Sequence, residues 1–182
     1  MASWSRIARR IRVPLGFAFA ILFFWLAHPT LLSLLAGCCL ALIGLIIRAL
    51  ASGHVRKNEQ LTTSGPYAYL RNPLYFGSLV LAAGFAVASL SGWVVVAMLL
   101  MFLAIYLPVI RSEEEFLRRQ FPEYEDYASQ VPRLIPRLRA FGNARGAFSW
   151  ELYSKHREYN AALGAVILML ALLAKMLWWQ KG

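Results

Sequence analysis

Charged residues are scarce in this 182-residue sequence, and acidic ones are the scarcest. Only 15% of the residues are charged, against about a quarter in a typical soluble domain, and 19 Lys and Arg outnumber 9 Asp and Glu. The two cysteines, Cys38 and Cys39, are adjacent and provide neither a disulfide framework nor a metal site, and no CxxC or HExxH motif occurs. We therefore predict no metal site, and the apolar composition excludes a disordered tail.

Long apolar runs, in contrast, are abundant. The sequence contains five of them: Val13–Ala27, Leu31–Leu50, Leu74–Leu90, Trp93–Ile110 and Ala161–Trp179. Their only charged residues are Arg48 and Lys175. A helix needs roughly 20 residues to cross a bilayer, with about 17 to 25 the usual range, so the first run is short and the other four suffice. Because no run alternates like a barrel strand, we predict an all-α integral membrane protein with five transmembrane helices.

Basic residues are distributed so that they fix an orientation. All but two of the 19 lie before the first run, around the connection of the second and third runs, or between the fourth and fifth; the exceptions are Lys175 and Lys181. The positive-inside rule then places the N-terminus in the cytoplasm and the C-terminus on the opposite side. We expect a multi-pass protein of a bacterial inner membrane, with membrane lipids as partners. The formal net charge of +10 follows from this sidedness and attraction to anionic lipid, and no nucleic-acid-binding module is recognisable.

The runs divide a single domain, residues 1–182, into three parts. Residues 13–50 form the first two transmembrane helices, and we expect the first to be retained because no small-x-small cleavage site follows Ala27. Residues 51–160 hold the third and fourth helices together with cytoplasmic segments, and residues 161–179 form the last helix. No strong small-xxx-small pattern stands out, so the oligomeric state is left open.

The first cytoplasmic segment leads into the third run. It contains a Ser64-Gly65-Pro66 turn, and Asn72-Pro73 predicts a helix start with Asn72 as the N-cap. Aromatic and basic side chains surround this boundary: Tyr67, Tyr69, Arg71 and Tyr75. They fit two interpretations equally: an interfacial aromatic belt with a snorkelling arginine, or a pocket whose aromatic faces suit a purine ring and a cationic sulfonium.

The second cytoplasmic segment runs from Arg111 to Asn160. Ser112 and Glu115 fit a capping box and predict a helix start at Ser112, after which an amphipathic helix would lie against the membrane until Pro122 interrupts it. Two prolines make Val131-Pro132-Arg133-Leu134-Ile135-Pro136 a semi-extended strap. Arg157 and Glu158 lie close to the last apolar run, either as a snorkelling interfacial pair or as functional groups.

Several of these motifs together resemble a known family. They are Gly65-Pro66-Tyr67, Tyr69-Leu70-Arg71-Asn72-Pro73-Leu74-Tyr75, Glu113-Glu114, and Phe121, Tyr124 and Tyr127 followed by the strap Val131–Pro136. The stretch from Leu61 to Pro136 closely resembles the core of the isoprenylcysteine carboxyl methyltransferase family, which is related to the membrane phospholipid N-methyltransferases. One departure is Asn72, where that family usually has His, so a binding role is kept there but a titrating role is in doubt.

The resemblance implies a membrane enzyme that uses S-adenosylmethionine, with cytoplasmic interfacial helices and a C-terminal cofactor-binding region. By the family pattern, the cofactor-binding positions are Tyr67, Asn72, Pro73, Tyr75, Glu113, Glu114, Val131, Pro132 and Ile135. Arg71, Arg157 and Glu158 are the candidate catalytic or substrate-orienting residues. The expected acceptor is lipophilic, a small molecule or a prenylated substrate such as an isoprenylcysteine carboxylate. The alternatives are a phospholipid or amine N-methyltransferase and a non-catalytic lipid-binding scaffold.

Overall fold

The computed structural model describes residue 16 and residues 18–56, 59–142 and 145–179. These residues form helices and no strand, as predicted. Residues 18–26 are helical. The later elements are α2 (Leu31–Ser52), the 3₁₀ helix η1 (Gly65–Ala68), α3 (Pro73–Ser89), α4 (Gly92–Met101), the π-helix η2 (Phe102–Tyr106), α5 (Leu107–Gln120), α6 (Tyr124–Gln130), α7 (Trp150–Lys155) and α8 (Tyr159–Trp179).

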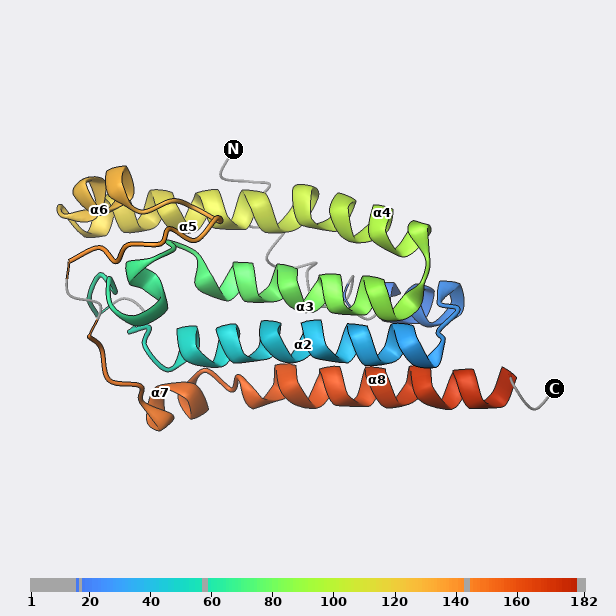
Figure 1. Cartoon of the computed structure of the whole chain (residues 1–182). Helices are drawn as coiled ribbons and strands as arrows, with labels where there is room; N and C mark the ends of the chain where they lie inside the picture. The colour runs from blue at the N-terminus through green and yellow to red at the C-terminus, as the bar shows by residue number, and fades with distance from the viewer. Residues whose placement is uncertain (1–15, 17, 57–58, 143–144, 180–182) are drawn as a thin grey trace.

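The long helices lie side by side, and the polar segments gather at one end of them. Figure 1 shows α2, α3, the α4–α5 rod and α8 running alongside one another. The elements η1, α6 and α7, with their connections, all lie at the same end, whereas short turns and the blue helix of residues 18–26 lie at the other. This arrangement brings the two segments singled out from the sequence to a common place.

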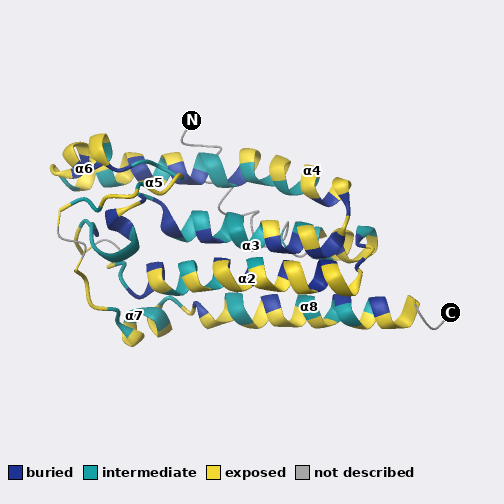
Figure 2. Cartoon of the chain, in the orientation of Figure 1, coloured by how far each residue is buried: buried dark blue, intermediate teal, exposed yellow. Residues whose placement is uncertain are grey.

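Three helices are long and apolar enough to cross a membrane: Leu31–Ser52, Gly92–Gln120 and Tyr159–Trp179. The helix α3, at 17 residues, is shorter, and its length of about 26 Å falls below a typical hydrocarbon core. Part of the first predicted span, residues 13–15 and 17, lies outside the described residues. Large apolar side chains such as Leu32, Leu100 and Ile167 are exposed along these helices (Figure 2), as expected where lipid replaces water.

The helix formed by the fourth apolar run extends beyond the end of that run. The helices α4, η2 and α5 join end to end from Gly92 to Gln120, so Ser112 lies inside a helix and the predicted helix start there is wrong. No glycine or proline separates Ile110 from the acidic residues, and the helix therefore continues past the apolar run. Pro108 explains the π-turn, because its ring would collide with the carbonyl of residue 104 in a regular α-helix.

Glycines allow α2 and α3 to pack at very short range. A Cβ atom on Gly44 would lie 2.5 Å from the backbone nitrogen of Leu81 and 2.8 Å from the carbonyl oxygen of Gly77. One on Gly84 would lie 2.6 Å from the backbone nitrogen of Ala41. The small residues therefore serve a contact between helices within the chain.

Lys175 links the last helix to the first one described. Its ammonium donates to the carbonyl oxygens of Phe24 at 2.5 Å and of Ala27 at 2.7 Å. Those carbonyls lie at the end of a helix, where no backbone donor follows, so the lysine satisfies them.

Candidate functional site

A cavity of about 1280 Å³ lies among the residues that gather at the polar end of the helices. Its lining comes from α2, α3, η1, α5, α6 and the turn before α8, which includes His156 and Glu158. Five arginines and four glutamates contribute: Arg48, Arg56, Arg71, Arg111, Arg119, Glu113, Glu114, Glu115 and Glu158. The cavity is thus rich in charge of both signs, and segments more than a hundred residues apart build it.

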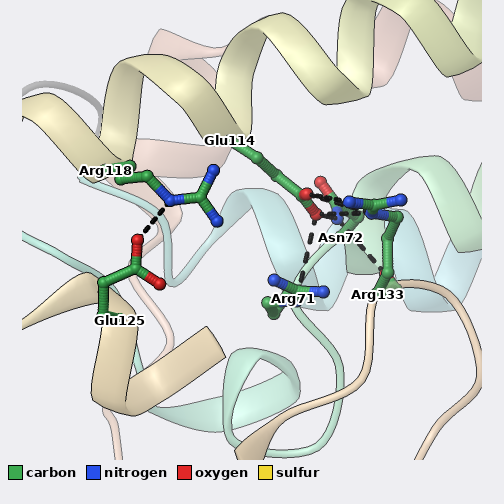
Figure 3. A network of polar contacts seen from close by, with 6 residues as sticks. All are labelled: Arg71, Asn72, Glu114, Arg118, Glu125 and Arg133. Carbon is green, nitrogen blue, oxygen red and sulfur yellow. Dashed lines mark hydrogen bonds and ion pairs between the residues drawn. The ribbon is translucent and has the colours of Figure 1, made fainter. Parts of the chain in front are cut away.

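The carboxylate of Glu114, on α5, is the centre of a buried polar network (Figure 3). Arg133 donates to it from Nε at 2.9 Å and from Nη2 at 2.6 Å, and Asn72 donates from Nδ2 at 3.0 Å. The Arg71 Nε lies 3.9 Å from it. The same Asn72 amide also donates to the Arg133 carbonyl at 3.2 Å, so two separate segments converge on the carboxylate of a third.

The strap occupies its predicted place, outside regular secondary structure, and is hydrogen-bonded to the segment before α3. The backbone N–H of Arg71 donates to the Pro132 carbonyl at 2.9 Å, and that of Arg137 donates to the Tyr69 carbonyl at 3.1 Å. Asn72 is the N-cap residue and Pro73 the first helical one, as predicted, but the Asn72 side chain makes no capping bond. It turns instead to Glu114, which explains why an amide is suited to this position.

Two buried polar atoms in the cavity wall have no hydrogen-bond partner among the described residues: Arg71 Nε and the Tyr124 hydroxyl. Burial, together with Glu114, raises the pKa of Tyr124, and the neighbouring Arg71 guanidinium opposes this shift. Buried donors without a hydrogen bond are rare because each costs about 1 to 3 kcal/mol. The pair therefore indicates a position at which a ligand would complete the bonding.

Tyrosines form a second part of the wall. Tyr67 is buried, and burial raises the pKa of its hydroxyl, as do the surrounding Tyr127, Glu113, Tyr75 and Glu158. A single hydroxyl therefore lies within electrostatic reach of carboxylates from α5 and from the turn before α8. The Tyr75 hydroxyl donates to Glu113 at 3.0 Å.

Tyr75 also packs edge-on against the ring of Tyr106, with a centroid separation of 6.1 Å. Both rings line the cavity. The wall thus offers aromatic surface beside the charged groups.

At the other end of the lining, Arg48 of α2 pairs with Glu158. The Arg48 Nε donates to Glu158 Oε1 at 2.5 Å, and its Nη1 donates to the Ser78 hydroxyl of α3. Both side chains of the ion pair are largely buried. The pair joins the end of α2 to the start of α8.

The structure brings together most, but not all, of the residues predicted for the site. The predicted residues that line the cavity are Tyr67, Arg71, Asn72, Tyr75, Glu113, Glu114 and Glu158. Pro73 and Val131 are buried but do not line it, and neither does Pro132. Ile135 is 78% exposed, and Arg157 is exposed with a left-handed backbone, φ 52°. The turn that points Glu158 inward directs Arg157 away.

Sequence reasoning missed Arg48 as a site residue. Arg48 had a usable signal, because it is the only charged residue in the second apolar run and an ionisable group there is costly. Arg133 lies in the predicted strap but nothing in the sequence connects it to Glu114. The described residues contain no group of three or more His, Cys, Asp or Glu side chains that could hold a metal ion.

The fold and the cavity define a membrane-type helical protein with a polar site at one end of its helices. A model of the phospholipid methyltransferase family matches residues 15–124, and the chain belongs to this family. The resemblance recognised from the motifs is thereby confirmed. No solved structure matches the chain.

Among curated proteins, the chain is similar to the cobalt-zinc-cadmium resistance protein CzcN of Cupriavidus metallidurans, with 38% identity over 74% of this chain and 61% of that protein. It is also similar to the nickel-cobalt-cadmium resistance protein NccN of Alcaligenes xylosoxydans xylosoxydans, with 37% identity over 64% of this chain and 54% of that protein. A probable protein-S-isoprenylcysteine O-methyltransferase of Oryza sativa is 34% identical over 55% of this chain and 59% of its own length. The chain therefore spans somewhat more than half the length of these relatives.

Proposed function

We propose that this protein is an S-adenosylmethionine-dependent methyltransferase of the membrane, which methylates a lipophilic acceptor in the cavity at the polar end of its helices. The family and the cavity support the proposal. The observation that carries it is the buried Arg71 Nε in the wall of that cavity, which lies 3.9 Å from Glu114 but makes no hydrogen bond with any described residue. At about 1280 Å³ the cavity exceeds the roughly 300 to 1,000 Å³ of a typical single-ligand site, which is consistent with two reactants.

The residues present fit the proposed cofactor. S-adenosylmethionine would supply a methyl group on a sulfonium sulfur, which is already activated toward nucleophiles. Arg71 would bind its carboxylate through Nε, since guanidinium groups suit carboxylates. Tyr67 and Tyr75 would provide aromatic surface for the adenine ring and the sulfonium. The remaining task of the protein is to hold the acceptor in line and to exclude water.

The network around Glu114 revises one predicted role. Glu114 was expected to contact the cofactor directly, but its oxygens already accept from Asn72 and Arg133. We propose that Glu114 instead positions Arg71 and the strap. Glu113, which is exposed and accepts from the Tyr75 hydroxyl, is the better carboxylate for a cofactor hydroxyl or amino group.

The test begins with calorimetric titration of the detergent-purified protein with S-adenosylmethionine. Arg71→Gln should weaken binding at least tenfold, whereas Arg118→Gln, in an exposed ion pair with Glu125 that does not line the cavity, should leave it unchanged. No binding to the wild type at millimolar ligand would favour the scaffold alternative. Methyl transfer from labelled cofactor into a lipid extract, with mass identification of an ester or an amine, would then separate the isoprenylcysteine-like acceptor from the phospholipid or other amine.

A further inference from the structure

Arg48 is an unusual residue for its position. It lies in α2, whose other residues from Leu31 to Ser52 are uncharged, and such a charge is costly enough to indicate a function. Its stem passes α3 at a glycine: a Cβ on Gly77 would lie 2.7 Å from the Arg48 Cγ. The missing side chain at Gly77 therefore leaves the path by which Arg48 reaches the cavity.

The contacts of Arg48 leave one side of its guanidinium unused. Nε donates to Glu158 and Nη1 to Ser78, while Nη2 has no hydrogen-bond partner among the described residues. Glu158 compensates the positive charge and holds the plane of the guanidinium. A guanidinium fixed in this way presents a directional pair of donors, which suits an oxyanion better than a freely moving lysine would.

Apolar side chains lie in the same lining as this ion pair: Val55, Leu74, Pro108 and Val109. A group that binds between them needs a charged head and an apolar body. Arg48, on α2, and Arg71, before α3, line this cavity from different segments of the chain. The cavity thus has two arginines, each with an unused donor, in separate parts of its wall.

We infer that Arg48 binds the oxyanion of the acceptor's headgroup, a carboxylate or a phosphate, with Glu158 and Ser78 as the residues that position it. This inference rests on the proposed function, because only a methyltransferase has a methyl acceptor. The binding of the anion by Arg48 can nevertheless be tested separately. The inference moves the substrate-orienting role that the family resemblance suggested for Arg157 to Arg48, because Arg157 is exposed and does not line the cavity. Glu158 also lies beyond residue 124, where the family match ends, so the C-terminal segment would contribute to acceptor selection.

The experiment compares two pairs of amphiphiles that differ in charge. N-acetyl-S-farnesylcysteine and its methyl ester test a carboxylate, and lysophosphatidic acid and monoacylglycerol of the same chain test a phosphate. Binding to the full-length protein in a neutral detergent is measured for the wild type and for Arg48→Gln. We expect the wild type to bind the anionic member of at least one pair tenfold or more tightly, and Arg48→Gln to reduce this ratio to within twofold.

Three controls make the outcome specific. Arg118→Gln removes an exposed ion-paired arginine outside the cavity and should keep the wild-type ratio. Glu158→Gln keeps the Arg48 charge but removes the carboxylate that positions it, and should reduce the ratio by less than Arg48→Gln does. If Arg48→Gln does not fold, Arg48→Lys, which keeps the charge but loses the fork, should reduce the ratio at least fivefold.

The pair that shows the preference identifies the source of the oxyanion. A wild type without preference for either anion, or a folded Arg48→Gln that keeps the preference, would overturn the inference while cofactor binding stays normal. Anion preference that depends on Arg48 in a protein that binds no S-adenosylmethionine would instead overturn the proposed function.

Discussion

At the scale of single residues, the burial of Glu114 favours a structural role. Its side chain is 4% exposed, and it is the shared partner of Arg71, Asn72 and Arg133. A carboxylate with this many donors stabilises the packing of α5 against the strap. Removing its charge leaves arginines without compensation, which costs more than losing an exposed pair.

Glu114→Gln should therefore lower the free energy of unfolding by about 3 kcal/mol, because it breaks a buried ion pair. The measurement is denaturant or thermal unfolding of the purified protein in detergent. Glu125→Gln, which removes the partner of exposed Arg118, is the matched control and should cost less than about 1 kcal/mol. Equal losses in the two variants would show that Glu114 has no special structural role.

The tyrosines predict a pH dependence. Burial raises the pKa of Tyr127 above its ordinary value of 10.0, and its hydroxyl donates to the Tyr67 carbonyl at 2.8 Å. Since the folded pKa is the higher one, the stabilisation is complete below pH 10 and is lost as the pH rises toward the folded pKa. At one pH unit above the unfolded pKa this loss is about 1.4 kcal/mol for one residue.

Tyr127→Phe should be less stable than the wild type at pH 8 by about 1 kcal/mol, because the hydrogen bond is gone. Between pH 9 and pH 11 it should lose less stability than the wild type does. Unfolding transitions at these pH values measure both effects. Parallel pH profiles for the two proteins would contradict the assignment of a raised pKa to Tyr127.

Some residues of the site could be predicted from the sequence, whereas the contacts between them could not. Asn72 and Glu114 could be proposed as site residues from their motif, and the structure places them in contact. The hydrogen bond between Asn72 and Glu114 could not be predicted, because it depends on how α5 is rotated against α3. The left-handed turn at Arg157, which leaves Arg157 exposed and Glu158 buried, has no signal in a sequence without glycine there.

At the scale of elements, apolar runs predicted the helices well and their continuity poorly. The boundaries of α2, α3 and α8 agree with the predicted runs to within about two residues, a normal uncertainty. The continuation of α5 beyond Ile110 was missed because a helix that leaves the membrane changes polarity without changing conformation. Hydropathy indicates whether a residue faces lipid or water, whereas the end of the helix is indicated by a residue such as Pro122.

The close packing of α2 against α3 predicts that a glycine-to-alanine substitution destabilises the protein there but not in α8. Gly44→Ala should destabilise the protein by about 1 to 3 kcal/mol, because its Cβ would meet the backbone of Leu81 and Gly77 and overpack the contact. Gly164→Ala, in α8, has nothing within 4 Å of its added Cβ and should be neutral or stabilising by up to about 1 kcal/mol, since alanine favours helix. Unfolding in detergent measures both. A stabilised Gly44→Ala variant would contradict the close approach of α2 and α3.

At the scale of the whole molecule, the cavity depends on a C-terminal segment that lies beside the family core. The motifs of the family core end near residue 136, yet Glu158 closes the same cavity. The α4–α5 rod ends at the polar end of the helices, and α7 lies at the same end, so the residues before α8 are placed beside the cavity (Figure 1). Local sequence patterns do not predict this placement. The common end of the polar segments could be predicted from the charge distribution, whereas the composition of the cavity could not.

The common end also makes the proposed orientation testable. Since most of the basic residues lie on the polar segments, we expect this end in the cytoplasm. Cys38 and Cys39 are exposed in α2 and are first replaced by serine. Single cysteines are then introduced as Leu138→Cys, at a fully exposed position beside the strap, and Gly92→Cys, at the opposite end of the helices with open space around it.

A maleimide that cannot cross membranes should label Gly92→Cys in intact cells and Leu138→Cys only after lysis. A soluble cofactor made in the cytoplasm has access to the cavity only in this orientation, so the experiment also bears on the proposed function. Labelling of Leu138→Cys in intact cells would place the cavity outside, and the charge distribution would then need another cause. Labelling of both variants in intact cells, with a cytoplasmic marker protein left unlabelled, would contradict a membrane-spanning arrangement of the helices between them.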